Sequence, residues 1–98
     1  MSTEVRRADG QYEILVDGVV AGFTQFREGE GGVLSFPHTV VEDAYEGQGL
    51  ASRLVREALD DVRAQGRLIH PTCPYVKSWI QKHEEYRDLV DDPARFGL

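Results

Sequence analysis

The sequence predicts a small mixed α/β (α+β) domain in which two helices cover a β-sheet, in the order β-β-β-α-β-α. Three observations predict this fold class. Apolar and polar residues alternate near the N-terminus, Asp17-Gly18 interrupts the alternation, and apolar residues recur every three or four positions after Gly49. Because domains typically have about 100 to 150 residues, we expect a single domain spanning residues 1–98.

The first two strands are predicted to form a hairpin. In the segment Gln11–Val16, the apolar residues Tyr12, Ile14 and Val16 are two positions apart and therefore lie on the same face. This period of two is typical of a strand with one buried side. Asp17-Gly18 follows and favours a type I′ turn, because both central positions of that turn need a positive φ. The run Val19–Phe26 is then the second strand.

A third strand is predicted at Val33–Val41, after the polar turn Glu28–Gly32. Pro37 lies within it and has no backbone N–H to give to a ladder, so it favours an edge position or a bulge. The next segment, Glu42–Gly47, has no periodicity and is interpreted as a loop.

The first helix is predicted to start after Gly49 and to end at Gly66, which suits the left-handed residue that follows a helix. Its spacing of three and four gives an amphipathic stripe. The stripe consists of Leu50, Leu54, Val55, Ala58, Leu59 and Val62.

A fourth strand, Arg67–Cys73, and a second helix opened by Pro74 complete the prediction. The inward face of that helix is predicted to carry Tyr75, Val76, Trp79, Ile80 and His83. From about Asp88 the tail is acidic and weakly patterned, with Phe96 as the residue expected to dock.

The charge balance restricts the partners. Eleven Lys and Arg face seventeen Asp and Glu, a formal net charge of −6, so we expect no nucleic-acid partner. No apolar run approaches the roughly 18 residues of a membrane span and no signal peptide is recognisable, so a cytoplasmic protein without membrane contact is expected. One cysteine excludes an internal disulfide, and no metal site is predicted.

The junction between the third strand and the first helix is the segment that predicts chemistry. A helix start presents unpaired N–H groups and partial positive charge. Gly47 and Gly49 lack side chains and Ala51 is small, so the backbone can approach an anion closely. This pattern predicts a phosphate or pyrophosphate cradle. On the pattern alone, a flexible entry turn is an equal alternative, and neither a P-loop nor G-x-G-x-x-G is present.

The segment Tyr45–Ala51 resembles the acyl-CoA-binding signature of the GNAT superfamily of N-acetyltransferases, Q/R-x-x-G-x-G/A. Gly49 and Ala51 match its last two fixed positions. The flanking stretches His38–Val41 and Cys73–Tyr86 resemble a minimal, single-domain branch of that superfamily, so the resemblance covers roughly residues 38–90.

The resemblance implies a GNAT-like fold and acetyl-CoA (coenzyme A) as cofactor, with an amine acceptor as the second partner. The implied cofactor-binding residues are Val40, Val41, Gly47, Gln48, Gly49, Leu50, Ala51, Ser52, Tyr75 and Lys77. The strand ending at Val41 would serve the pantetheine arm, and the N–H groups of Gln48–Ser52 the pyrophosphate. The 3′-phosphate has four candidate partners on the helix surfaces, and the alternative for each is a solvated surface residue: Arg53, Arg56, Lys77 and Lys82.

One signature position departs from the family. Glu46 stands where Gln or Arg is usual, and a carboxylate aimed at a pyrophosphate would repel it. We therefore expect Glu46 to point into solvent. The chain also lacks the helices after the first strand and the extra final strands of larger relatives, so its acceptor side is predicted to be open.

Three residues are candidates for catalysis, and each has a structural alternative. Cys73, at a helix start, is predicted either to carry a transient acetyl-thioester, to contact the CoA sulfur, or to be a buried small residue. His38 is either a base for the ammonium of the acceptor or a structural histidine. Glu42 is the competing base or a solvated carboxylate. Tyr75 and Tyr86 are weaker candidates for protonating the CoA thiolate.

The sequence thus favours an acetyl-CoA-dependent N-acetyltransferase acting on an amine, as a monomer or weak homodimer. A non-catalytic acyl-CoA-binding module is the alternative, and a simple anion-binding or scaffold domain is a third.

Overall fold

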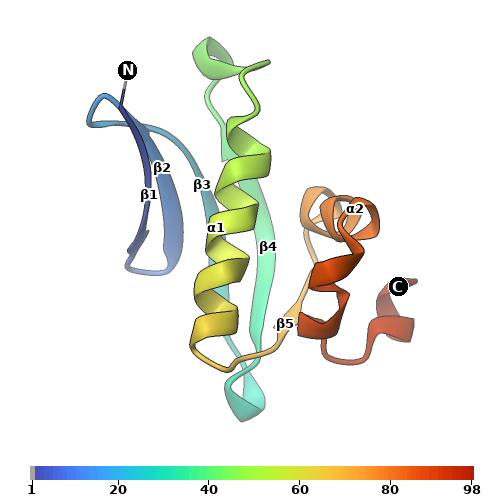
Figure 1. Cartoon of the computed structure of the whole chain (residues 1–98). Helices are drawn as coiled ribbons and strands as arrows, with labels where there is room; N and C mark the ends of the chain where they lie inside the picture. The colour runs from blue at the N-terminus through green and yellow to red at the C-terminus, as the bar shows by residue number, and fades with distance from the viewer. Residues whose placement is uncertain (1) are drawn as a thin grey trace.

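The computed structural model describes residues 2–98, which form one curved sheet with helices against it (Figure 1). The strands are β1 Thr3–Ala8, β2 Gln11–Val16, β3 Val19–Glu28, β4 Leu34–Val41 and β5 Ile69–His70. The helices are α1 Leu50–Ala64 and α2 Pro74–Lys82, with short 3-10 turns at Glu30–Gly32, Asp43–Tyr45, Glu84–Leu89 and Pro93–Phe96. The predicted mixed sheet with two covering helices is confirmed.

The strands lie in chain order, β1-β2-β3-β4-β5. Neighbours from β1 to β4 are antiparallel, and β5 is parallel to β4 because α1 forms the crossover between them. The predicted hairpin turn is confirmed, with φ of 50° at Asp17 and 82° at Gly18. The predicted end of α1 is confirmed as well, since Gly66 has φ of 69°.

The predicted element order lacked β1, and this is a correction. Thr3–Ala8 pairs along its whole length with β2 at the edge of the sheet. Val5 is its one large apolar residue, so the alternation that revealed β2 is absent there. Its backbone pairs with β2 over all six residues, while its side chains add only the partly buried Val5 to the core.

The core lies between the sheet and α1, which crosses in front of β3 and β4 (Figure 1). The six predicted stripe residues of α1 are all buried. They pack against Tyr12, Ile14, Leu34 and Phe36 from the sheet. Burying an apolar side chain contributes about 1.5–3 kcal/mol, so this layer holds α1 and its N-terminus in a fixed position.

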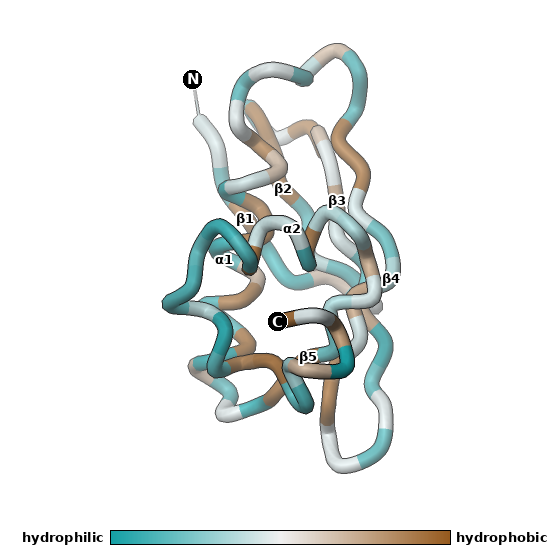
Figure 2. Tube along the Cα trace, turned by 90° about the vertical axis from the view of Figure 1, so that its right-hand side faces the viewer, coloured by the Kyte–Doolittle hydropathy of each residue, from teal (hydrophilic) through white to brown (hydrophobic). Residues whose placement is uncertain are grey.

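The C-terminal third packs beside α1 and closes the β5 edge of the sheet. The predicted strand 67–73 shortens to Ile69–His70, and Val90 bridges to Ile69 from the other side. Phe96 docks as predicted, with its ring 5.4 Å from that of His70. Figure 1 and Figure 2 show the C-terminus on the side of α2 that faces away from the sheet.

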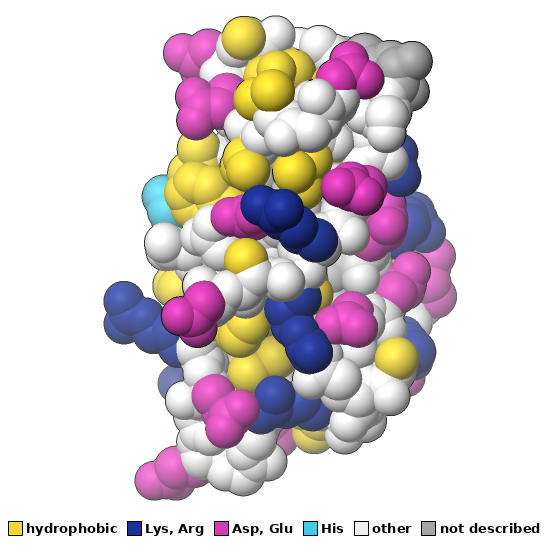
Figure 3. All heavy atoms as spheres, turned by 90° about the vertical axis from the view of Figure 1, so that its left-hand side faces the viewer, with side chains coloured by type: hydrophobic (Ala, Val, Ile, Leu, Met, Phe, Trp, Pro, Cys, Tyr) yellow, Lys and Arg dark blue, Asp and Glu magenta, His cyan; other side chains and the backbone are white. Residues whose placement is uncertain are grey.

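The side of the molecule formed by β1 and β2 carries interspersed acidic and basic side chains (Figure 3). They form ion pairs such as Arg6–Glu13 at 2.9 Å and Arg53–Glu57 at 2.6 Å. Within residues 2–98, no helix combines the length and apolar character needed to cross a membrane.

Candidate functional site

A cavity of about 320 Å³ opens where β4 ends and α1 begins. Its walls come from β4, the connecting loop, the first turn of α1 and the start of α2. It is lined by Thr39, Val41, Tyr45, Glu46, Gly47, Gly49, Leu50, Ala51, Ser52 and Tyr75. The cavity therefore coincides with the junction that the sequence singled out.

A β-bulge in β4 shapes one wall of the cavity. Ser35 pairs with Arg27 and His38 pairs with Gln25, so β4 has one more residue than β3 between these pairs. Pro37 sits in that interval, which confirms the predicted bulge. The extra residue changes which side chains face α1: Phe36 faces it before the bulge and Thr39 after it.

Beyond the bulge, the edge of β4 nearest β5 is open. Parallel pairing with β5 is limited to Leu34 with Ile69 and Ser35 with His70. The last backbone hydrogen bond between the two segments runs from the N–H of Cys73 to the carbonyl of Phe36, at 2.7 Å. The two segments then separate, which leaves a slot beside the last residues of β4.

The backbone of Thr39 and Val41 faces this slot. The N–H of Glu42 donates to the carbonyl of Ala21 in β3 at 2.8 Å. Because successive strand residues direct their polar groups to opposite sides, Val40 also faces β3, and Thr39 and Val41 face away from it. Extended ligands can pair with such a free strand edge.

The start of α1 leaves its backbone donors unpaired. Gly49 is the N-cap in a left-handed conformation, φ 73°, and offers no side-chain cap, while Gly47 has φ 80°. Within residues 2–98, no acceptor bonds the N–H groups of Gly47, Gln48, Gly49, Leu50, Ala51 and Ser52; Arg53, which donates to Gly49 at 3.2 Å, is the first paired residue. A Cβ at Gly47 or Gly49 would meet nothing within 4 Å, so both glycines border open space. Exposed donors at the positive end of a helix fit an anion.

Two ionisable side chains stand at the rim. Glu46 is solvent-exposed but also lines the cavity, so the expectation that it points into solvent holds only in part. Tyr75 lines the cavity with 40% of its surface exposed, and burial of the remainder raises the pKa of its phenol. It is therefore not fully inward-facing as the helix stripe predicted.

Cys73 and Thr39 are linked by a hydrogen bond. Cys73 is buried, and its Sγ–H donates to Thr39 Oγ1 at 3.6 Å. Thr39 Oγ1 is in turn 2.9 Å from Thr24 Oγ1, which is fully buried. Sequence reasoning missed Thr39, although alternation counted backwards from Val41 would have assigned both residues to one face.

His38 and Glu42 lie outside the cavity lining. His38 is exposed on the face of the sheet opposite α1, with its ring 6.2 Å from that of Phe23. Glu42 is exposed just after β4. The structure therefore does not bring His38, Glu42 and Cys73 together around one group.

Seven of the ten predicted cofactor-binding residues line the cavity: Val41, Gly47, Gly49, Leu50, Ala51, Ser52 and Tyr75. Val40 and Gln48 are not among the lining residues, although the Gln48 N–H belongs to the unpaired series. The Lys77 ammonium lies beside Gly97 in the C-terminal turn. Residues 2–98 contain no cluster of His, Cys, Asp and Glu suited to hold a metal ion.

Comparisons with known proteins identify the family. Residues 11–89 match the sequence model of the family described as GCN5-related N-acetyltransferase. Protein NATD1 from Gallus gallus and from Mus musculus is 35% identical over 51 residues, which cover 52% of this chain and 46% of each relative. The matched part thus spans about half the length of these curated relatives.

Two solved structures share the fold. A candidate GCN5-like N-acetyltransferase from Staphylococcus aureus superposes with a TM-score of 0.71 at 20% identity, covering 90% of this chain and 87% of that one. A ribosomal-protein-alanine N-acetyltransferase from Brucella melitensis biovar Abortus 2308 gives a TM-score of 0.57 at 20% identity, covering 83% and 60%. At such identities the likeness concerns the fold alone.

Proposed function

Because the chain belongs to the GCN5-related N-acetyltransferase family, we propose that it binds acetyl-CoA in the cavity at the start of α1 and transfers the acetyl group to an amine. The cofactor supplies the activated acetyl thioester. The acceptor is a small-molecule or protein amine, and the protein acts in the cytoplasm as a monomer or weak homodimer.

The observation that carries this proposal is the series of unpaired N–H groups from Gly47 to Ser52. Five of these six residues line the cavity, and the two glycines among them have positive φ. Hydrogen bonds from neutral donors to an ionised oxygen are roughly twice as strong as neutral pairs, so a diphosphate suits this end of α1. Of the other predicted contacts, Val41 supports the proposal through its free backbone edge, while Val40 and Lys77 have the weakest support.

The free edge of β4 can bind the pantetheine arm of the cofactor. The backbone of Thr39 and Val41 can pair with the amides of a pantetheine arm along the slot beside β5. An N–H in this position also polarises a thioester carbonyl, because a fixed donor stabilises the negative charge that develops on oxygen during acyl transfer.

The acceptor amine approaches from the open face of the sheet, where His38 is exposed. Because His38 lies outside the cavity, it removes the ammonium proton through water, with Glu42 as the competing base. Tyr75 lines the cavity and its phenol is protonated at neutral pH, so it can donate a proton to the departing thiolate; burial, which raises the pKa of this phenol, makes it a weaker acid than an exposed tyrosine. Cys73 is buried and donates its thiol proton to Thr39, which favours direct attack by the amine over an acetyl-thioester on Cys73.

One observation favours a second candidate, a non-catalytic acyl-CoA-binding module. Neither His38 nor Glu42 lines the cavity, so neither side chain touches the reacting atoms without a water relay. Such a module would bind acetyl-CoA without turnover.

Titration with acetyl-CoA tests the shared part of both candidates. We expect the melting temperature to rise with cofactor concentration, because a ligand that binds only the folded state stabilises it. No shift at millimolar acetyl-CoA would remove both. Release of CoA thiol with a panel of amines and peptides then distinguishes the enzyme from the module. Turnover that persists in Cys73→Ser supports direct attack, and turnover lost with binding retained supports the relay.

A further inference from the structure

We propose that Trp79 is a positioning residue, whose indole N–H holds the Ser52 hydroxyl so that Ser52 donates its own proton to an anionic oxygen in the cavity. The inference rests on the proposed function and deepens it, because it assigns a specific side-chain donor to the diphosphate.

The hydrogen-bond geometry at Ser52 defines the direction of its proton. Trp79 Nε1 lies 2.8 Å from Ser52 Oγ. An indole N–H can only donate, so Ser52 must accept and its hydroxyl proton is left for another partner. A serine inside a helix commonly donates to a carbonyl one turn earlier, but none of residues 2–98 accepts from Ser52 Oγ.

Ser52 stands where such a proton can meet a ligand. It is the third residue of α1, half-buried, and lines the cavity beside the unpaired N–H groups. A phosphate oxygen at this helix start would meet these backbone donors and the Ser52 hydroxyl together. Hydrogen bonds to an ionised oxygen are stronger than those between neutral groups. Because Trp79 already orients the Ser52 hydroxyl, that donor loses little conformational entropy when the ligand binds.

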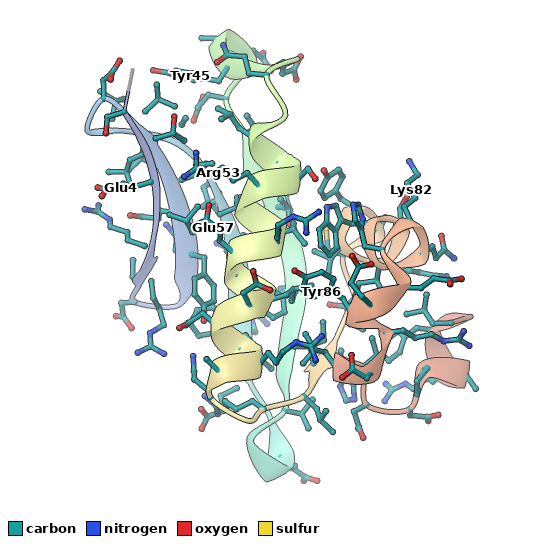
Figure 4. The ribbon with its side chains drawn as sticks, viewed as in Figure 1. Glu4, Tyr45, Arg53, Glu57, Lys82 and Tyr86 are labelled. Atoms are coloured by element: carbon teal, nitrogen blue, oxygen red, sulfur yellow. The ribbon has the colours of Figure 1, made fainter. Side chains whose placement is uncertain are left out.

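The indole is held in this orientation from several sides. Trp79 is 4% exposed, and the His83 ring stacks on it at 4.0 Å and 16°. His83 Nδ1 also bonds the Trp79 carbonyl at 2.8 Å. The Tyr86 ring meets the indole edge-on at 4.9 Å, and the Arg56 guanidinium lies 5.5 Å from its centre. Figure 4 shows Tyr86 between α1 and the C-terminal turns.

A double-mutant cycle tests the inference, with CoA affinity measured by calorimetry for the wild type, Trp79→Phe, Ser52→Ala and the double variant. Loss of its hydrogen bond to an ionised oxygen should weaken CoA binding roughly ten- to hundredfold in Ser52→Ala, and by a smaller factor in Trp79→Phe, which keeps the Ser52 hydroxyl but not its orientation. The double variant should be no weaker than Ser52→Ala, because Trp79 acts through Ser52. Two fully additive losses, or unchanged CoA affinity in Trp79→Phe, would overturn the inference.

A second readout separates positioning from a merely structural role. Acetyl-pantetheine lacks the diphosphate, so its KM should be the same in Trp79→Phe and the wild type, while the KM for acetyl-CoA rises and kcat is unchanged. Tyr86→Phe is the matched control for CoA affinity. The Tyr86 hydroxyl donates to Asp60 at 2.7 Å and Tyr86 does not line the cavity, so the structure does not support it as the group that protonates the CoA thiolate, and removing its hydroxyl should leave CoA affinity unchanged.

If Trp79→Phe fails to fold, the fluorescence emission of Trp79 in the wild type and in Ser52→Ala tests the inference instead. Trp79 is the single tryptophan of the chain. CoA should shift its emission in the wild type and much less in Ser52→Ala at equal saturation, and equal shifts would refute the coupling. Absence of CoA binding to the wild type would instead refute the proposed function.

Discussion

The two ends of α1 differ in how their backbone groups are paired. At the C-terminal end, the N–H of Gln65 donates to Asp61 and Val62, that of Gly66 donates to Arg63, and that of Arg67 donates to Val62. At the N-terminal end, the N–H groups from Gly47 to Ser52 have no acceptor within residues 2–98. Both ends carry a glycine with nearly the same positive φ, 73° at Gly49 and 69° at Gly66.

Side chains repeat the difference. Near the C-terminal end, Asp61 accepts from Tyr12 at 2.6 Å and from Gln65 at 2.8 Å. Arg63 holds Asp88 through two bonds, at 2.8 and 3.0 Å. The N-terminal end has no side-chain cap. One end is thus completed by the fold itself, whereas the other is left for a ligand to complete, at some cost in stability.

Replacing the glycine at each end of α1 with alanine should give the largest difference between the two ends. A left-handed conformation costs an alanine about 1–2 kcal/mol, so Gly49→Ala and Gly66→Ala should each lower the free energy of unfolding by about that amount. In Gly49→Ala the strained N-cap and the added methyl also disturb the cradle, so CoA affinity should fall ten- to hundredfold, which is about 1.4 to 2.7 kcal/mol. Denaturant unfolding and calorimetric titration measure the two quantities.

Gly66→Ala is the matched control, because a Cβ at either glycine meets nothing within 4 Å. Its CoA affinity should equal that of the wild type. Equal losses of affinity in both variants would mean that Gly49 acts through stability alone.

At the C-terminal end of α1, the bond between Tyr12 and Asp61 should make the stability of the protein depend on pH. Burial, and then the hydrogen bond to Asp61, raise the pKa of Tyr12 from 10.0 to about 12. Above pH 10 the unfolded chain loses this proton before the folded one, so the stabilisation is complete below pH 10 and is lost as pH rises to 12. The loss is on the order of 2 kcal/mol.

Chemical unfolding of the wild type and of Tyr12→Phe between pH 9 and about pH 12 measures this contribution of Tyr12. The other titrating groups contribute equally to both free energies of unfolding and cancel when one is subtracted from the other. The two stabilities should converge as pH rises. A difference that is constant over this range would contradict the assigned role of the Tyr12 phenol.

Local signals predicted most of the fold. Asp17-Gly18 and Gly66 adopt the positive φ that their positions predicted, because turn chemistry depends on few neighbours. β1 was not predicted, because it is defined by backbone pairing with β2, and the side chains of Thr3–Ala8 show no apolar–polar alternation that would indicate a strand. The strand at Arg67–Cys73 was predicted too long, since β4 and β5 separate early.

The site was predicted where it depends on consecutive residues and missed where it depends on tertiary contacts. Gly47–Ser52 form one local segment, so the glycines before a helix, together with the family resemblance, pointed to the place where the structure has a cavity; ligand binding there stays a prediction. Thr39 faces the cavity because the bulge at Pro37 changes the phase of β4, and strand alternation counted from Val33 does not carry across a bulge. The bond from Trp79 to Ser52 joins residues 27 positions apart and has no sequence signal.

The smallest effect concerns the charge at the open end of α1. Glu46 lines the cavity, so its carboxylate opposes the positive end of the helix and repels an anionic ligand. Glu46→Gln should strengthen CoA binding two- to fivefold, about 0.4 to 1 kcal/mol, and the gain should shrink at high ionic strength because the group is exposed. Asp43→Asn removes the same charge from an exposed residue of the preceding 3-10 turn that does not line the cavity, so it should leave the affinity almost unchanged. An equal gain in both variants, measured by titration at low and high salt, would show that the overall net charge of −6 sets the repulsion rather than the position of Glu46 at the rim.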